Sequence, residues 1–324
     1  MRKILFVLAA VSCALPAAAA GPRAPFVFAV ASDIHCDPFN RKAAAKFSAA
    51  LKDAYKAGAR AMAVAGDASD GVEGDAAYIR GLAAASPLAG NVRFSMGNHE
   101  YYSAFHDKDG GWNSDTFPNG QTDEAARGRF NALRGAAAGS PVYYDEWLGG
   151  YHFIFLAGEA SRMASAENSD DAVISDAQLA WLRSALAATP AGEPVFVFLH
   201  QPFPDTVAGS FDGAVSIKNA AALRAALSAA PGVILFSGHS HYSLTLAGNH
   251  YTGGEYKFDA FNCSSVWEPY GADNKPLPGD HSEGFIVAAG PDGVTVRGRD
   301  FARGRYIDGQ AYSFPARAAA AEAK

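Results

Sequence analysis

Five short apolar runs along the chain each end abruptly in polar residues. The runs cover residues 26–31, 61–65, 92–96, 195–199 and 233–236 and consist mainly of Val, Ile, Ala and Phe. A continuous apolar run of this length is typical of a strand that is buried on both faces, as in sheets covered by helices. Ligand sites in such sheets form beyond the carboxyl ends of the strands. We therefore expect the polar residues that follow the five runs to converge at one edge.

Segments of helical and β periodicity fill the rest of the chain. The pattern predicts five helices, at residues 41–57, 75–85, 122–133, 175–187 and 217–229. It predicts a hairpin and four later strands, at residues 142–144 with 151–157, and at 243–247, 256–263, 283–288 and 293–299. Residues 101–120 read as a long loop rich in Gly, Asp and aromatic residues, of a kind that is usually functional or mobile. Alternating units before a β-rich last third favour one α/β domain with two sheets between helical layers.

The first twenty residues differ from the rest of the chain. Arg2 and Lys3 precede an apolar stretch at residues 4–15 and small residues up to Ala20, which is the order of a secretory signal. The apolar stretch is too short to span a bilayer, which needs roughly 20 residues. We therefore expect residues 1–20 to be a cleaved signal peptide of an exported protein, periplasmic or secreted. Residues 21–315 would form the single domain, and the Ala-rich tail at 316–324 would be disordered.

Composition and charge narrow the function classes. The chain has 324 residues, of which 49% are hydrophobic and 19% charged, and its net charge is −6. An acidic protein repels polyphosphate backbones, which argues against stable binding of nucleic acid. Only Cys36 and Cys263 remain after cleavage of the leader. Export permits a disulfide between them, but two distant cysteines form no framework, and two free thiols are the simpler expectation.

The residues that follow the apolar runs form a donor set for metal ions. They are Asp33, His35, Asp67, Asn98, His200, His239 and His241. Carboxylates, imidazoles and an amide oxygen suit Mn, Fe, Zn or Ni better than Ca, which prefers more oxygens and no histidine. Seven donors are too many for one tetrahedral ion but fit two ions that share a carboxylate, and Asp67 is the natural bridge. The competing interpretation is that these residues merely end strands, as Asp and Asn often do.

Five motifs in this set resemble, in order, those of the calcineurin-like metallophosphoesterase superfamily. They are Asp33-Ile34-His35, Gly66-Asp67, Gly97-Asn98-His99-Glu100, His200 and Gly238-His239-Ser240-His241. The resemblance implies a four-layer α/β/β/α sandwich of two mixed sheets, with a dinuclear metal site at the strand carboxyl ends. By the same resemblance one ion is held by Asp33, His35, Asp67 and His241, and the other by Asp67, Asn98, His200 and His239.

The resemblance also implies a reaction. A hydroxide between two divalent or mixed-valence ions would attack the phosphorus of a small phosphomonoester or phosphodiester in line. His99 would stabilise the transition state or protonate the leaving oxygen, and Glu100 would orient His99 or shape the entrance. Purple acid phosphatases carry a tyrosine shortly after the bridging aspartate, whereas Ala68-Ser69-Asp70 follows Asp67 here. That departure argues against this branch.

Several alternatives stay open at this stage. A narrower enzyme would be a phosphodiesterase for cyclic nucleotides or glycerophospho-compounds. A different class would be a non-catalytic metal-binding surface protein that keeps the fold. Asp70 could accept a hydrogen bond from a histidine of the site or simply turn the chain, and His106 is a candidate to overhang the metals. Aromatic residues of the loops could wall a substrate pocket or pack the loops: Tyr101, Tyr102, Trp112, Trp267 and Tyr270.

Overall fold

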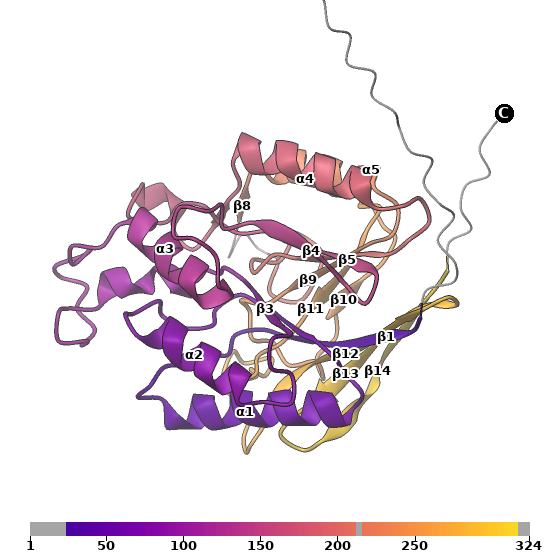
Figure 1. The fold of residues 1–324 in the computed structure, drawn as a ribbon, viewed down its shortest axis with the longest axis horizontal. Coiled ribbons are helices and arrows are strands. Elements are labelled where there is room, and N and C mark those ends of the chain that lie inside the picture. The colour runs from indigo at the N-terminus through magenta and orange to yellow at the C-terminus, as the bar shows by residue number, and fades with distance from the viewer. Residues whose placement is uncertain (1–23, 212–215, 317–324) are drawn as a thin grey trace, which may run out of the picture.

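The computed structural model of the chain describes residues 24–211 and 216–316. The expected signal peptide at residues 1–20 and nearly all of the expected tail at residues 316–324 lie outside the described residues. Figure 1 shows two sheets face to face, with α4 and α5 over one outer face and α1 and α2 over the other. This arrangement confirms the expected four-layer α/β/β/α sandwich of two mixed sheets.

The first sheet joins the two ends of the domain. Its order is β14 (Arg305–Pro315), β13 (Gly293–Asp300), β12 (Glu283–Gly290), β1 (Phe26–Ala31), β2 (Met62–Ala65) and β3 (Val92–Ser95). β1, β2 and β3 run parallel, and β12 pairs with β1 in the antiparallel direction. The carboxyl ends of β1, β2 and β3 therefore lie side by side.

The second sheet repeats this arrangement around β7 and β9. Its order is β10 (His250–Tyr251), β11 (Asp259–Asn262), β9 (Val233–Ser237), β7 (Val195–Phe198), β5 (Tyr151–Phe155) and β4 (Tyr144–Leu148). The four central strands are parallel, and β10 and β4 close the edges in the antiparallel direction. A separate two-stranded sheet pairs β6 (Ala172–Val173) with β8 (Ile217–Lys218).

The structure contains the five helices that the sequence pattern predicts, with small shifts at their ends. They are α1 (Arg41–Lys56), α2 (Asp75–Ala84), α3 (Asp123–Arg134), α4 (Asp176–Ala188) and α5 (Ala220–Ala229), with short 3-10 helices η1 (His99–Phe105) and η2 (Ala166–Asn168). Side-chain caps fix three of the helix starts: Asn40 accepts from the N–H of Ala43, Thr122 from that of Ala125, and Ser175 from that of Gln178.

Three apolar clusters hold the layers together. Alternate residues of β1 face opposite ways, so Ala29 and Ala31 pack under α1 and α2, while Phe28 and Val30 enter the core between the sheets. That central core is strongly aromatic, and the rings of Phe28 and Phe196 lie 4.7 Å apart, centroid to centroid. A third cluster lies under α4 and α5. Because the central core pins the sheets face to face, the carboxyl ends of both sheets are held close to each other.

Three predictions about elements need correction. Residues 243–247 form turns rather than a strand, because the side-chain amide of Asn249 donates to the carbonyls of Ser243 and Leu246 and closes the segment. The helix predicted from residue 217 begins only at Ala220, after β8. β14 was not predicted at all, because it is a half-exposed edge strand without a strong apolar pattern. The predicted loop at residues 101–120 begins within η1.

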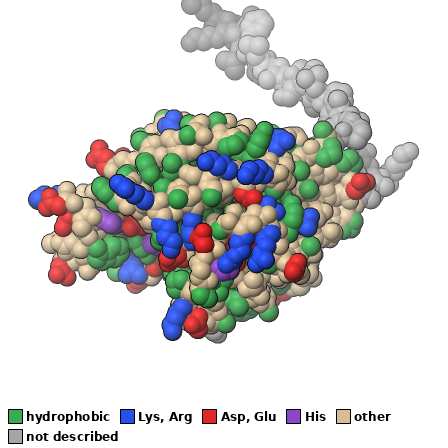
Figure 2. All heavy atoms as spheres, turned by 90° about the horizontal axis from the view of Figure 1, so that it is seen from below, with side chains coloured by type: hydrophobic (Ala, Val, Ile, Leu, Met, Phe, Trp, Pro, Cys, Tyr) green, Lys and Arg blue, Asp and Glu red, His purple; other side chains and the backbone are tan. Residues whose placement is uncertain are grey.

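Three further observations bear on the sequence-based expectations. Cys36 and Cys263 are buried free thiols, as expected. Figure 2 shows basic and acidic side chains interspersed over the face turned toward the viewer. Among the described residues, no helix is long and apolar enough to cross a membrane.

Candidate metal centre

All seven candidate ligands follow the carboxyl ends of parallel strands, as predicted. Asp33 and His35 follow β1, Asp67 follows β2, and Asn98 follows β3 in the first sheet. From the second sheet, His200 follows β7, and His239 and His241 follow β9. The two sheets thus contribute to one site at their common edge.

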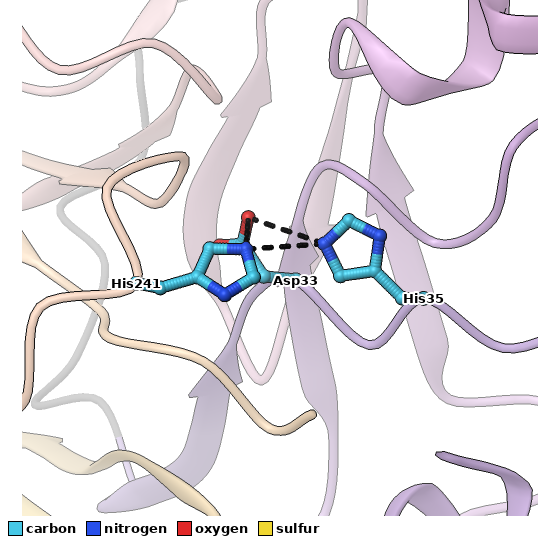
Figure 3. A group of neighbouring side chains, drawn as sticks. All are labelled: Asp33, His35 and His241. Carbon is cyan, nitrogen blue, oxygen red and sulfur yellow. Dashed lines mark hydrogen bonds and ion pairs between the residues drawn. The ribbon is translucent and has the colours of Figure 1, made fainter. Parts of the chain in front are cut away.

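The first group of donors consists of Asp33, His35 and His241 (Figure 3). The Nε2 atom of His241 lies 3.1 Å from Oδ1 of Asp33 and 3.1 Å from Nε2 of His35. Oδ1 of Asp33 is 3.9 Å from Nε2 of His35. The three donor atoms therefore point at one another from segments that are more than 200 residues apart in the sequence.

The second group consists of Asp67, His200 and His239, with Asn98 beside them. Oδ2 of Asp67 lies 3.0 Å from Nε2 of His200. Oδ1 of Asn98 lies 2.9 Å from Nδ1 of His239. Asp67 also forms a group with His35 and His99 whose donor atoms lie within 4.8 Å of one another. Asp67 is therefore placed between the two groups, as a shared ligand must be.

The hydrogen bonds of His200 and His241 leave the Nε2 atom of each ring available to bind a cation. Nδ1 of His200 lies 2.8 Å from the carbonyl of Ala65, and Nδ1 of His241 lies 3.0 Å from the carbonyl of Glu268. Because a carbonyl only accepts hydrogen bonds, each Nδ1 carries the hydrogen, and in the neutral ring Nε2 keeps its lone pair. This tautomer is the one that a metal-ligating histidine needs.

Buried atoms of the site also lack hydrogen-bond partners. Oδ1 of Asp33 and Nε2 of His200 are buried without one, and both side chains are fully buried. In the part of the chain that the structure describes, the ion pairs of Asp33 and Asp67 involve histidines and no Lys or Arg. Burying two carboxylates without a permanently charged partner is costly, so this donor set fits metal cations.

The pKa values of His200 and Asp33 also favour binding of cations at this site. Burial works against a charged His200, but Asp67 and Asp33 outweigh it and raise its pKa to about 10. Although burial opposes the ionised carboxyl, His241 and His200 lower the pKa of Asp33 to about 2. The carboxylates thus draw positive charge into the site, and bound cations would take the place of the protons on the histidines.

Asn98 is oriented by a hydrogen-bond chain that the sequence did not reveal. Its Nδ2 donates to the hydroxyl of Tyr102 (3.3 Å), and that hydroxyl donates to Oδ1 of Asp170 (3.0 Å). Because the amide nitrogen is engaged in this way, Oδ1 of Asn98 faces His239 and the site. Tyr102 was considered as a wall of a substrate pocket, but Asp170 follows no strand and matches no motif, so no sequence signal marks it.

His99 sits at the rim of the metal centre. Its Nδ1 lies 2.7 Å from Oδ1 of Asp70, its Nε2 lies 3.9 Å from Oδ2 of Asp67, and the side chain is 28% exposed. Burial lowers its pKa, but Asp67 and Asp70 outweigh this and raise it to about 9. Oδ2 of Asp70 lies 3.1 Å from Nε2 of His106. Asp70 is therefore a hydrogen-bond partner of His99, and His106 joins the following loop to it.

Glu100 does not play the expected part. Its carboxylate accepts hydrogen bonds from the backbone N–H groups of Ala68 and Gly97, each at 2.6 Å, and the side chain is buried. Glu100 thus ties together the segments that carry Asp67 and Asn98. It neither orients His99, which is the part of Asp70, nor shapes an entrance, because its carboxylate points into the protein.

The backbone around the ligands is unusual. Five of the seven ligands have positive φ values, namely Asp33 (51°), His35 (41°), Asp67 (52°), His239 (70°) and His241 (55°). The motif glycines make room beside them, because a Cβ atom at Gly97 would collide with Oδ1 of Asp67, and one at Gly238 with Asp33. These contacts explain why glycine precedes the ligand in both motifs.

The remaining aromatic candidates divide between packing and the rim of the site. Tyr101 is buried, and its hydroxyl donates to the carbonyl of Gly158, so it packs the loop. The ring of Tyr102 lies 3.9 Å from that of His99, and the ring of Tyr270 lies 4.9 Å from that of His241. Trp112 is 59% exposed, and Trp267 lies under Lys42 and Lys46.

We compared the chain with protein families and with solved structures. The family model described as calcineurin-like phosphoesterase matches residues 26–243. A dimetal phosphatase from Danio rerio is similar in structure, with a TM-score of 0.59 and 15% identity, over 91% of this chain and 100% of that one. A purple acid phosphatase from yellow lupin seeds has a TM-score of 0.58 and 11% identity, over 90% of this chain and 54% of that one.

A third similar structure is GAP50 of Plasmodium, with a TM-score of 0.50 and 14% identity, over 90% of this chain and 89% of that one. No protein of the curated collection matches the sequence significantly. At these identities the similar structures establish the fold, whereas the family match over two thirds of the chain also covers all seven candidate ligands.

Proposed function

Because the chain belongs to the calcineurin-like phosphoesterase family and is a hydrolase of phosphoric esters, we propose that it cleaves small phosphate esters at a pair of metal ions. One ion would be held by Asp33, His35 and His241, the other by Asn98, His200 and His239, with Asp67 shared between them. The placement of Asp67 between two groups of donors is the observation that carries this proposal. Two such ions, when bound, clamp the attacking and leaving oxygens of an in-line displacement at phosphorus.

The chain's own contribution to the reaction would come from His99. Its side chain lies at the rim of the donor cluster and is 28% exposed, which leaves it within reach of a bound ester. Asp70 would hold Nδ1 and so aim Nε2 at the site. His99 would then stabilise charge on the phosphoryl group or donate its proton to the leaving oxygen.

The donor set also suggests which metals bind. Four imidazoles and an amide oxygen accompany two carboxylates, a mixture that favours Mn, Fe, Zn or Ni over Ca or Mg. We expect metal analysis of the purified protein to find two equivalents drawn from this group.

A direct test is hydrolysis of p-nitrophenyl phosphate and bis-p-nitrophenyl phosphate, before and after chelation and with Mn, Zn or Fe restored. We expect turnover of at least one ester, loss on chelation, and recovery with a metal of this group. Faster turnover of the diester would favour a phosphodiesterase for cyclic nucleotides or glycerophospho-compounds. No turnover with any metal would refute the proposal and favour a non-catalytic metal-binding surface protein.

The non-catalytic alternative has a structural counterpart in GAP50, which is described as the anchor in the inner membrane complex of Plasmodium. Against this alternative, every donor of the two groups is present here, and so are His99 and Asp70. A chain that only anchored a complex would have no need of a histidine held by an aspartate at the rim of a buried donor cluster.

Export is part of the same proposal. The order of charged, apolar and small residues up to Ala20 supports a signal peptide that is removed after Ala20. Mass spectrometry of the protein isolated from the periplasm or medium should find Gly21 as the first residue. A protein that retained Arg2 and Lys3 and stayed in the cytoplasm would contradict this.

A further inference from the structure

A small pocket lies directly beside the second group of ligands. Its wall includes Gly97 and Asn98 on one side, and it is lined further by Tyr102, Phe105, Phe117 and Gln201. Its volume is about 370 Å³ when the mouth that opens to solvent is counted. The interior is narrow and has room for one group about the size of a water molecule rather than for a ring.

Gln201 lines this pocket and carries a buried acceptor without a partner. The side chain is 2% exposed, and its Oε1 atom has no hydrogen-bond partner. Its Nε2 donates to the backbone carbonyl of Asp170 at 2.8 Å. Because that carbonyl can only accept, the amide cannot be turned around without losing the bond, so the atom left free is the oxygen. A buried acceptor without a donor is costly, and a ligand that supplies the donor gains accordingly.

The position of Gln201 in the chain connects this acceptor to the reaction. It follows His200 immediately, and the pocket wall contains Asn98, so two candidate ligands of the second ion adjoin the pocket. A phosphate ester bound at the metal centre would extend its alcohol part into adjacent space. A short alcohol chain fits the narrow interior, whereas the aromatic ring of a nitrophenyl ester would stay outside it, at the mouth that opens to solvent.

We propose that Gln201 recognises a small hydrogen-bond donor, a hydroxyl or an amino group, on the alcohol part of the substrate. This inference rests on the proposed function and deepens it, because it names the substrate class as phosphate esters of short alcohols that carry such a donor. Water would fill the pocket when the ester lacks the group, so the expected preference is moderate, about tenfold rather than the much larger factors of a dry site.

The test compares esters that differ by one group. The ratio of kcat/KM is measured for 2-hydroxyethyl phosphate over ethyl phosphate and for 2-aminoethyl phosphate over ethyl phosphate. We expect the metal-loaded wild type to prefer at least one of the first esters by about tenfold. The variant Gln201→Leu should bring that ratio to within about twofold of one, and Gln201→Glu, which keeps an acceptor, should retain a preference. Gln310→Leu on the distant β14 is the matched control and should keep the wild-type ratio.

Binding of the matching phosphonates separates this inference from the proposed function, because phosphonates are not hydrolysed. Calorimetry with 2-hydroxyethyl-, 2-aminoethyl- and ethylphosphonate should give the same order of affinity in wild type and its loss in Gln201→Leu. Equal binding of all three to wild type, or a preference that survives in folded Gln201→Leu, would overturn the role of Gln201. Absence of hydrolysis with an intact binding preference would overturn the proposed function alone. Thermal melting and metal content show whether each variant is folded, and equal ratios in wild type would overturn the role of Gln201 even if Gln201→Leu is not folded.

Discussion

Removal of the Tyr102 hydroxyl tests whether the metal centre depends on the residues behind its ligands. Tyr102 accepts a hydrogen bond from the amide nitrogen of Asn98 and donates one to Asp170. The variant Tyr102→Phe keeps the ring that lies against His99 and deletes only this link. We expect weaker binding of the ion held by Asn98 and little change at the other ion.

The structure gives the expected magnitude. The bond from Asn98 to Tyr102 is 3.3 Å long and joins neutral groups, so its loss corresponds to about 0.5 to 1.5 kcal/mol, or roughly two- to twelvefold in affinity. Loss of a hydrogen-bond partner of a metal ligand typically lowers metal affinity by about 10 to 100-fold. Asp170 is 31% exposed, so water can replace the donor that it loses. The two ranges overlap near tenfold, which is the expected loss of affinity.

The assay is a calorimetric titration of the metal-free protein with Zn or Mn, which resolves two binding events. Tyr101→Phe is a matched control, because it removes a hydroxyl from the neighbouring residue that donates to the carbonyl of Gly158 and touches no ligand. Tyr101→Phe should bind both ions as wild type does. If the two variants bound metal alike, or if Tyr102→Phe weakened both ions equally, the orienting role of Tyr102 would be refuted.

Four further predictions test other parts of the site and the fold. Asp67→Asn should weaken both ions whereas Asp33→Asn should weaken one, and metal analysis that found one full equivalent in Asp67→Asn would exclude the bridge. His99→Ala should keep two metals and lose about 10² to 10⁴-fold in kcat, and a rate within threefold of wild type would remove it from the reaction. Glu100→Gln should leave the pH profile of kcat unchanged, because the carboxyl does not reach the site, but it should lower the free energy of unfolding by about 1 to 3 kcal/mol, because the amide nitrogen cannot accept one of the two backbone bonds. Burial raises the pKa of Asp75 to about 6, so the folded protein binds the extra proton between about pH 4 and 6 and the free energy of unfolding falls as pH rises through that window. The variant Asp75→Asn has no charge to bury and does not lose stability in this window, but it gives up the favourable interaction of a carboxylate with the N-terminus of α2. With both effects counted, it should be more stable than wild type by about 2 kcal/mol at pH 8 and by almost nothing near pH 4, as urea unfolding would show.

The convergence of the candidate ligands could be predicted from the sequence because each of them lies just after an apolar run. A buried parallel strand has one allowed place in a sheet covered by helices, so the residue after Phe198 and Leu199 must emerge at the carboxyl edge. His200 could therefore be assigned to the site although no motif surrounds it. The same logic located Asp67 and Asn98.

The residues behind the ligands could not be predicted in this way. Asp170 and Gln201 meet through a loop that has no periodicity, and their contact depends on how that loop folds over η1. Glu100 was misassigned because its position beside His99 in the sequence says nothing about the direction of its side chain. In the 3-10 helix the two side chains diverge, so His99 faces Asp70 and Glu100 faces the backbone of Ala68.

The backbone of the candidate ligands shows how the fold positions the site. A non-glycine residue at positive φ costs about 1 kcal/mol or more, and five ligands adopt that conformation. Backbone bonds between strand ends hold them there, because the N–H of Asp33 donates to the carbonyl of Gly66 and the N–H of His35 donates to the carbonyl of Asp67. The N–H of His239 donates to the carboxylate of Asp33 and so joins the second sheet to the first. Since the aromatic core between the sheets fixes the distance between these strand ends, the fold itself holds the donors close to one another.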